Sequence, residues 1–428
     1  MLRRLDLRGK TGDLRAHLPA PEAGGEGPVA AVAEIVAAVR ERGDDAVRDL
    51  TLRFDGVRIE ELLVPAHELK DALESLDPTL RAALEVAVDR VGDFHRHQLA
   101  ETAHPATYER DGVTVRTEFR AVERAACYVP GGRAVYPSTV VHTAVPARIA
   151  GVDEVVLCVP PDDTGHVPAV TLAAAALAGV DEVYRIGGAQ AIAAVAYGTA
   201  SIRPVDVIVG PGNIYVALAK RAVADVCGVP TAFAGPSEVV VVADATAPVE
   251  LVAVDVLVQA EHGPLGLAWL VCWDEAVADA VTAEVARQVA VAPRRAEIEA
   301  TLASSGYAVL CDSPEQAMAV SNAVAPEHLE LITADPEALV PLVRHAGAVF
   351  CGPATPASLG DYLAGPSHVL PTHRSARFGQ ALTVRDFLKE VHVVTATPAG
   401  MAALAPHLEA LASAEGLLAH AESATRRR

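Results

Sequence analysis

The residue types best suited to catalysis lie between Gln259 and His420. Glu327 and His328 are adjacent in this stretch, so a carboxylate and an imidazole could act together as acid and base. Four further side chains carry the nitrogen and oxygen donors that a borderline metal ion accepts; they are Gln259, His262, Asp361 and His420. A metal set combined with an acid/base pair indicates an enzyme.

Gln259 and His262 have the spacing of two ligands on one helix face, because residues three apart leave a helix on the same side. The ordinary alternative is a helix end, where Gly263-Pro264 stops the chain and His262 bonds the terminal carbonyl groups. Asp361 follows Ser358-Leu359-Gly360, which predicts a tight turn, and an Asx turn is the ordinary role of aspartate there. Each of these positions alone is weak evidence of a metal.

Pro326, Glu327 and His328 are predicted at the end of a helix, since the residue before a proline avoids the helical region. With an intrinsic pKa of about 6.5, a histidine suits base catalysis near neutrality, and a partly buried glutamate could activate water. A surface Glu-His pair is the commoner occurrence. Glu415 and His420 lie five residues apart on a predicted C-terminal helix, where solvent exposure is the alternative to a shared cleft.

Length and charge restrict the classes of partner. The 428 residues, 51% of them hydrophobic, predict two or three domains. A formal net charge of −20 opposes binding to nucleic acids and anionic membranes, and an anionic dinucleotide would need backbone N–H groups or a helix N-terminus. The six cysteines are widely spaced, several of them in apolar runs, which indicates buried reduced thiols. Since no apolar stretch resembles a signal peptide or a membrane span, we expect a cytoplasmic protein.

The two ends of the chain have mainly helical spacing. Most of the first hundred residues follow this pattern, and residues 108–122 then alternate around Asp111-Gly112, which favours a hairpin. Residues 397–423 are predicted to be helical with a break at Pro406. Their apolar stripe has no core of its own, so it must dock on another surface, such as a second subunit.

The middle of the chain alternates between strand-like and helical segments. This alternation predicts a parallel βαβαβ unit followed by a second α/β layer. Glycine turns at Gly187-Gly188-Ala189-Gln190 and Gly210-Pro211-Gly212-Asn213 end two strands, yet neither has the Gly-x-Gly-x-x-Gly fingerprint of dinucleotide binding. The expected strands are residues 152–159, 181–186, 205–209, 238–243, 267–272, 307–311 and 348–351.

Nine short motifs, in this order, resemble those of the histidinol dehydrogenase family, and the resemblance covers nearly the whole chain. They are Tyr128-Val129-Pro130-Gly131-Gly132, Gly187-Gly188-Ala189-Gln190-Ala191-Ile192, Val209-Gly210-Pro211-Gly212-Asn213, Ala234-Gly235-Pro236-Ser237-Glu238, Gln259-Ala260-Glu261-His262, Ala325-Pro326-Glu327-His328-Leu329-Glu330, Gly360-Asp361-Tyr362, His368-Val369-Leu370-Pro371-Thr372 and Glu415-Gly416-Leu417-Leu418-Ala419-His420. Chance agreement at so many positions is negligible.

The resemblance implies a site shared between the subunits of a homodimer, with one zinc ion per subunit and NAD as cofactor. The implied zinc ligands are Gln259, His262, Asp361 and His420, the last from the partner subunit. The implied substrate contacts are these four together with Ser237, Glu327, His328, His368 and Glu415. The implied NAD contacts are Tyr128, Gln190 and Asn213.

We expect an α/β fold with two Rossmann-like, incompletely doubly wound domains, an N-terminal helical arm and a C-terminal helical tail. The first α/β domain would combine residues 25–127 and 236–382 and carry most of the metal and catalytic site. Residues 128–235 would form an inserted Rossmann-like domain. Residues 1–24 would form the arm, and residues 383–428 a tail that docks on the partner subunit.

The reaction implied by the resemblance is the four-electron, NAD-linked oxidation of L-histidinol to L-histidine through histidinal, the last steps of histidine biosynthesis. His328 would take the alcohol proton, and Glu327 would activate water on the aldehyde. The alternatives are a dehydrogenase of another small polar alcohol, a zinc hydrolase that uses Glu327 as base, and an inactive binding protein. Retention of all four ligands and of the Glu-His pair argues against the last.

Three stretches depart from the family pattern. Gly263-Pro264-Leu265-Gly266-Leu267 follows His262 where Asp-Pro is usual, Val207 replaces a frequent lysine, and Gln380-Ala381-Leu382-Thr383 replaces Ser-Gly-Leu-Ser. These changes flank the implied site without removing a ligand. They leave room for a different alcohol, but Glu415 and His420 argue for a substrate that carries an imidazole and an amine.

Overall fold

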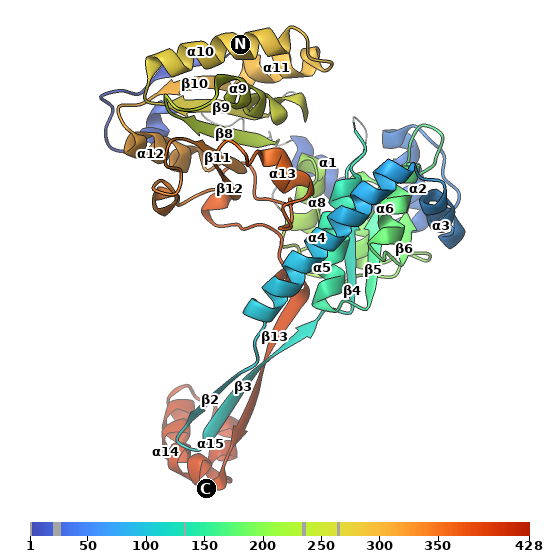
Figure 1. The fold of residues 1–428 in the computed structure, drawn as a ribbon. Coiled ribbons are helices and arrows are strands. Elements are labelled where there is room, and N and C mark those ends of the chain that lie inside the picture. Colours follow the sequence, from blue (N-terminus) through green and yellow to red (C-terminus); the bar gives the residue numbers. More distant parts are fainter. Residues whose placement is uncertain (1, 20–26, 132–133, 233–236, 263–265) are drawn as a thin grey trace.

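The computed structural model describes residues 2–19, 27–131, 134–232, 237–262 and 266–428. These residues form two parallel sheets and a three-stranded antiparallel ribbon (Figure 1). The α/β class predicted from the sequence is confirmed. In the described ranges no helix is long and apolar enough to cross a membrane, and none of the six cysteines is paired.

The larger sheet has six strands, all parallel, because each strand is followed by a crossover or comes from a distant segment. Its central strands are continuous apolar runs, as expected for a sheet covered on both faces. In spatial order the strands are β1 (Arg3–Asp6), β10 (Gly306–Leu310), β9 (Leu267–Cys272), β8 (Glu238–Ala243), β11 (His328–Ile332) and β12 (Ala348–Cys351). The helices of this half are α9 (Val249–Val258), α10 (Glu275–Val289), α11 (Arg295–Ser305), α12 (Pro314–Val324) and α13 (Ala357–Tyr362).

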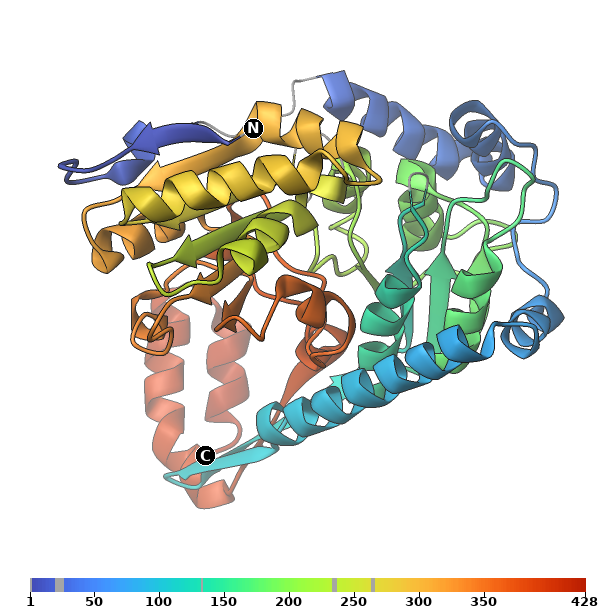
Figure 2. The same ribbon diagram turned by 45° about the horizontal axis from the view of Figure 1, so that its top comes forward.

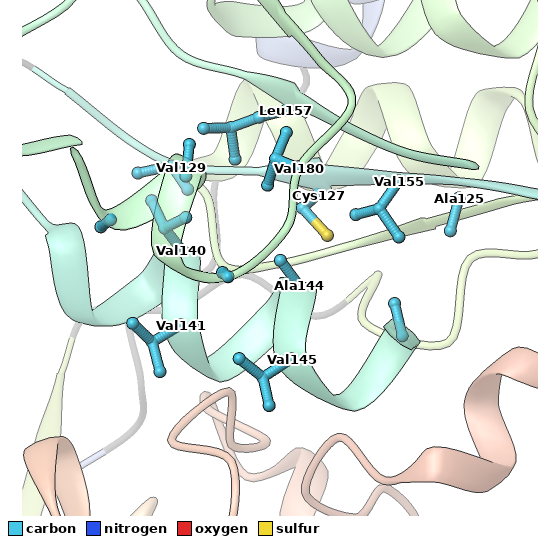
Figure 3. Close-up of a cluster of buried hydrophobic side chains, with 14 of the residues drawn as sticks. Ala125, Cys127, Val129, Val140, Val141, Ala144, Val145, Val155, Leu157 and Val180 are labelled. Atoms are coloured by element: carbon cyan, nitrogen blue, oxygen red, sulfur yellow. The ribbon is translucent and has the colours of Figure 1, made fainter. Parts of the chain in front are cut away.

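The smaller sheet has four parallel strands in the middle of the chain, which confirms the predicted βαβαβ unit. In spatial order they are β6 (Glu182–Tyr184), β5 (Glu154–Cys158), β4 (Arg124–Tyr128) and β7 (Val207–Val209). The chain runs outward from β4 and then returns to its other side, so the carboxyl ends of β4 and β7 form a topological switch point. Figure 3 shows part of the core on one face, where Cys127 and Val155 pack on Val140 and Ala144.

The N-terminal helices cover this smaller sheet. They are α1 (Gly27–Arg42), α2 (Asp44–Asp55), α3 (Ala66–Glu74) and α4 (Pro78–Thr102). The first two pack with α7 (Gly188–Tyr197) and α8 (Ile214–Ala222), and the others with α5 (Pro137–Ala150) and α6 (Ala169–Leu177). Figure 2 shows them on the side of the smaller sheet.

This packing differs from the sequence expectation, which grouped residues 25–127 with the sheet of residues 236–382. An amphipathic stripe predicts that a helix is buried, but it does not say against which sheet. The N-terminal arm also differs, since residues 3–6 add strand β1 to the edge of the larger sheet. That pairing joins residues about 300 positions apart, which local periodicity cannot reveal.

The antiparallel ribbon connects the body to the C-terminal tail. It consists of β2 (Ala106–Arg110), β3 (Val113–Ala121) and β13 (Leu388–Ala396). The predicted hairpin is confirmed, with Asp111 and Gly112 both at positive φ, as a type I′ turn requires. Strand β13 was not expected. Beyond it, α14 (Pro398–Ala414) continues through Pro406, where a break was predicted, and α15 (Leu418–Thr425) follows.

Candidate active site

A cleft between the two sheets is lined by three of the predicted site residues and by one of the predicted glycine turns. Both halves of the molecule line it, the smaller sheet through its glycine turn after β7 and the larger sheet through the segments around β8 and β11. Its lining is Gly210, Pro211, Gly212, Pro230, Thr231, Ser237, Glu327, His368, Val369, Leu370, Pro371, Thr372 and Gln380. The cleft thus brings the predicted catalytic glutamate beside two predicted substrate contacts, Ser237 and His368.

Glu327 and His328 are held by the backbone of one residue, Glu238. Helix α12 ends with Ala325 in the left-handed region, and β11 begins at His328 beside β8. The Glu238 N–H donates to Glu327 Oε2 at 3.0 Å, and the Glu238 carbonyl lies 3.1 Å from His328 Nδ1. Since a carbonyl only accepts, Nδ1 carries a proton in either charge state of the ring, and Nε2 is the basic nitrogen that titrates. Sequence reasoning missed Glu238, although it ends the Ala-Gly-Pro-Ser-Glu motif.

The basic nitrogen of His328 points at Asp361, with 3.3 Å between Nε2 and Oδ1. Burial lowers the pKa of His328, but the charges of Glu327 and Asp361 and the hydrogen bond to Asp361 outweigh it and raise the pKa to about 9. Burial raises the pKa of Glu327 to about 7 and that of Glu238 to about 8. Groups that titrate this close to neutrality are suited to proton transfer.

Gln259 and Asp361 meet beside this histidine. Gln259 follows the last residue of α9 and is 1% exposed, and its Nε2 lies 3.4 Å from Asp361 Oδ2. Its Oε1 is buried without a hydrogen-bond partner within the described part of the chain. Asp361 lies in helix α13, whereas a tight turn was predicted. An unsatisfied amide oxygen next to a carboxylate is a donor set that a cation would complete.

The other two predicted ligands are His262 and His420. The side chain of His262 is outside the described residues, although its backbone continues α9 as a short 3-10 helix, Ala260–His262. Among the side chains that are described, no group of three or more His, Cys, Asp or Glu could hold a metal ion. Gln259 and Asp361 are therefore two donors of a site that needs others.

His368 is fixed by a second histidine that sequence reasoning missed. His368 Nδ1 lies 2.8 Å from the carbonyl of Asp361, and its ring stacks on His142 with 4.3 Å between centroids. His142 Nδ1 accepts from the His368 N–H at 3.2 Å, so its Nε2–H donates to the Tyr362 carbonyl at 3.3 Å. Burial lowers the pKa of His142 well below its ordinary value, which keeps this neutral tautomer. A histidine in a mainly apolar helix was the available signal.

The three predicted NAD contacts lie at the carboxyl edge of the smaller sheet. The Tyr128 hydroxyl accepts from the Gly188 N–H at 3.0 Å, and Asn213 caps helix α8. Gln190 is 1% exposed, and its Oε1 has no hydrogen-bond partner among the residues described. Gly210 has a φ of 106°, and a Cβ there would lie 2.1 Å from the Tyr128 carbonyl oxygen, so only glycine fits.

Lys220 is a further residue that the sequence did not reveal. Its buried ammonium donates to the carbonyl of Gly210 and to the carbonyl and hydroxyl of Thr231. Burial lowers the pKa of Lys220 to about 7. The side chain thus places a cation directly behind the glycine turn that lines the cleft.

A family model described as histidinol dehydrogenase matches residues 22–428. The chain belongs to the histidinol dehydrogenase family. The histidinol dehydrogenase of Parasynechococcus marenigrum is 49% identical over 393 residues, which cover 92% of this chain and 89% of the relative. That of Thermobifida fusca is 46% identical over 431 residues, covering 100% and 98%. The crystal structure of histidinol dehydrogenase from Elizabethkingia anophelis matches with a TM-score of 0.91 at 32% identity, covering 100% of this chain and 98% of that one.

Membership of the histidinol dehydrogenase family makes the chain an enzyme of the oxidoreductase class, as the sequence predicted. Two predicted residues lie far from this cleft, however. Glu415 and His420 line a groove between α14 and α15, and Figure 1 shows these helices at the end of the molecule opposite the larger sheet. Within one chain of this histidinol dehydrogenase fold, the tail does not reach the site.

Proposed function

We propose that this protein oxidises L-histidinol to L-histidine through histidinal in histidine biosynthesis, with two NAD+ reduced per molecule at one site. The observation that supports it most is the cluster of Glu327, His328 and Asp361, whose Glu327 lines a cleft together with the glycine turn of a Rossmann-like sheet. An acid/base pair thereby faces the place where a dinucleotide would enter.

The two catalytic residues would act in sequence. In its neutral form His328 takes the alcohol proton on Nε2 in the first oxidation, because Nδ1–H is held by the Glu238 carbonyl. A cation bound at Asp361 would favour this neutral form, since the negative charge of Asp361 helps to raise the pKa of His328 to about 9. Glu327, with its pKa raised to about 7 by burial, is part deprotonated at neutrality and activates water on the aldehyde. His328 then helps the hydrate lose its proton in the second oxidation. The 3.6 Å between His328 Nδ1 and Glu327 Oε2 is longer than a hydrogen bond, but it is short enough for the charge of each group to stabilise the opposite charge on the other.

A zinc ion fits the donors that are present. The ligands would be Gln259, His262 and Asp361, together with His420 of the partner subunit. The orphaned Oε1 of Gln259 beside the Asp361 carboxylate supports this assignment. When bound, such an ion would hold the imidazole and amine of the substrate and orient the alcohol, since a site without thiolates can expand its coordination.

Histidinol and NAD would be held from opposite walls of the cleft. Ser237, His368 and Glu415 of the partner subunit would contact the substrate beside the ligands already named. Tyr128, Gln190 and Asn213 would contact NAD, and the unpaired Gln190 Oε1 near the switch point supports that role. This arrangement requires a homodimer in which each tail completes the other subunit's site. Histidine biosynthesis, the pathway proposed here, suits a location in the cytoplasm.

The ratio of NADH formed to histidinol consumed tests the proposal. With limiting histidinol and excess NAD+, absorbance at the NADH band should report two NADH per histidinol. A ratio of one would mean an ordinary alcohol dehydrogenase, and no NADH would favour a zinc hydrolase that uses Glu327 as base. Other small polar alcohols supplied in the same assay would reveal a changed substrate.

A further inference from the structure

Glu330 is a buried carboxyl group that the proposed mechanism leaves without a role. It follows His328 by two residues on strand β11, so both side chains leave the same face of the sheet. The side chain is 1% exposed. Its Oε1 accepts the N–H of Ala357 at 2.7 Å, and its Oε2 has no donor in the ranges that the structure describes.

The carboxyl group of Asp255, on helix α9, is the neighbour of Glu330 in this buried region. Asp255 is 6% exposed, and its carboxyl group interacts directly with that of Glu330. Two buried carboxyl groups in contact must share a proton, because two adjacent buried negative charges are strongly unfavourable. Burial raises the pKa of both groups, that of Glu330 to about 8, so the pair retains its proton near neutrality.

The pair joins the three elements that carry the candidate metal and base residues. Asp255 precedes Gln259 by four residues, Glu330 follows His328 by two, and Ala357 precedes Asp361 by four in α13. Helix α13 has only six residues, and its N-cap, Pro356, provides no side-chain hydrogen bond. Glu330 therefore supplies the acceptor that the start of this helix needs.

We propose that the Asp255 and Glu330 carboxyl pair is a positioning device that ties α13 to α9 and β11 and thereby sets Asp361 against Gln259 for metal binding. A buried carboxyl pair is a costly way to fill a core, and apolar side chains of similar size would stabilise the fold better. Unlike apolar side chains, the pair makes directional hydrogen bonds, such as the one from the Ala357 N–H, and these fix the orientation of α13. This inference rests on the metal site of the proposed function.

Substitutions at Glu330 separate its geometry from its charge. Glu330→Gln keeps an oxygen for the Ala357 N–H and gives Asp255 a permanent donor, so zinc affinity should stay within about threefold of the wild type. Glu330→Ala removes both contacts, and zinc affinity should fall by roughly 10- to 100-fold, as is typical when an outer partner of a ligand is lost. Competition with a chromophoric chelator on metal-stripped protein measures both.

Asp386→Ala is the matched control. Asp386 caps another short helix, η5 (Val384–Phe387), by accepting the Thr383 N–H at 2.7 Å. This substitution should lower stability to urea without changing zinc affinity. Equal zinc affinity in Glu330→Ala and the wild type would overturn the proposal, as would an equal loss in Glu330→Gln and Glu330→Ala.

Amide hydrogen exchange on the metal-free protein tests the positioning role of Glu330 without depending on the proposed zinc site. Residues 357–362 should exchange faster in Glu330→Ala than in the wild type or Glu330→Gln, while the other helices keep their protection. Unchanged protection of α13 would refute the positioning role whether or not zinc binds. If the wild type binds no zinc but α13 is loosened, the metal assignment fails and the link between Glu330 and α13 remains.

Discussion

Two inactive variants should restore each other's activity if the tail completes the site of a second subunit. Asp361 lies beside His328, and His420 lies on a tail at the far end of the same chain. In a heterodimer of Asp361→Asn and His420→Asn chains, one site then holds both substitutions and the other holds neither. Random reassociation gives about half heterodimers with one intact site of two, hence about a quarter of wild-type activity.

The assay mixes the two purified variants in equal amounts, exchanges subunits in mild denaturant and measures initial NADH formation. Each variant alone should remain inactive. The control mixes Asp361→Asn with Gln259→Ala, because these residues meet within one chain at 3.4 Å and every heterodimer site keeps one defect. Recovery in the control, or none in the first mixture once tagged heterodimers are demonstrated, would refute the shared site.

Three further predictions follow from buried groups. His142→Phe keeps the ring stack but leaves the His368 N–H and the Tyr362 carbonyl without their partner. Urea unfolding should therefore show that the free energy of unfolding falls by about 2–4 kcal/mol, and initial rates should show a higher KM for histidinol. His95→Phe, which loses only a bond to Val91, should leave that KM unchanged. Burial lowers the pKa of Lys220 from 10.5 to about 7, so above pH 7 the unfolded chain binds more protons than the folded one. Stability should therefore rise between pH 7 and 9 by up to about 3 kcal/mol, and urea titrations of Lys220→Met should lack this contribution. With histidinol or histidinal as substrate, His328→Asn should slow the first oxidation and Glu327→Gln should block only acid formation; equal loss of both steps in both variants would contradict this division.

The sequence predicted the parts of the fold that local pattern encodes. Valine-rich runs such as β8 match the buried strands because strands covered on both faces need no polar side. Turn chemistry located the hairpin at Asp111-Gly112 and the glycine turn at Gly210. The nine motifs in their order identified the family, and together they carry more information than the spacing of any single pair of residues. Gln259, Asp361, Glu327 and His328 do meet in the structure, although their roles remain proposals.

Long-range partners could not be predicted in this way. Strand β13 pairs with β3 across about 270 residues, and β1 pairs with β10 across about 300, with no local signal for either. Glu238 acts on Glu327 and His328 through its backbone N–H and carbonyl, which every residue possesses. His142 and Lys220 lie in helices whose other residues are mainly apolar, and their roles emerge only from what packs against them.

The electrostatics of the cleft explain how so acidic a protein could accept an anionic dinucleotide. The net charge is −20, and Glu238, Glu327 and Asp361 concentrate carboxyl groups at the side of the cleft formed by the larger sheet, where Glu327 lines it. Burial keeps the first two partly protonated near neutrality, which reduces the repulsion. On the opposite wall, Lys220 lies behind the glycine turn, and its pKa of about 7 leaves it only partly charged there. A phosphate at the turn would favour the charged form of Lys220, so the cation would become strongest when the proposed cofactor is bound.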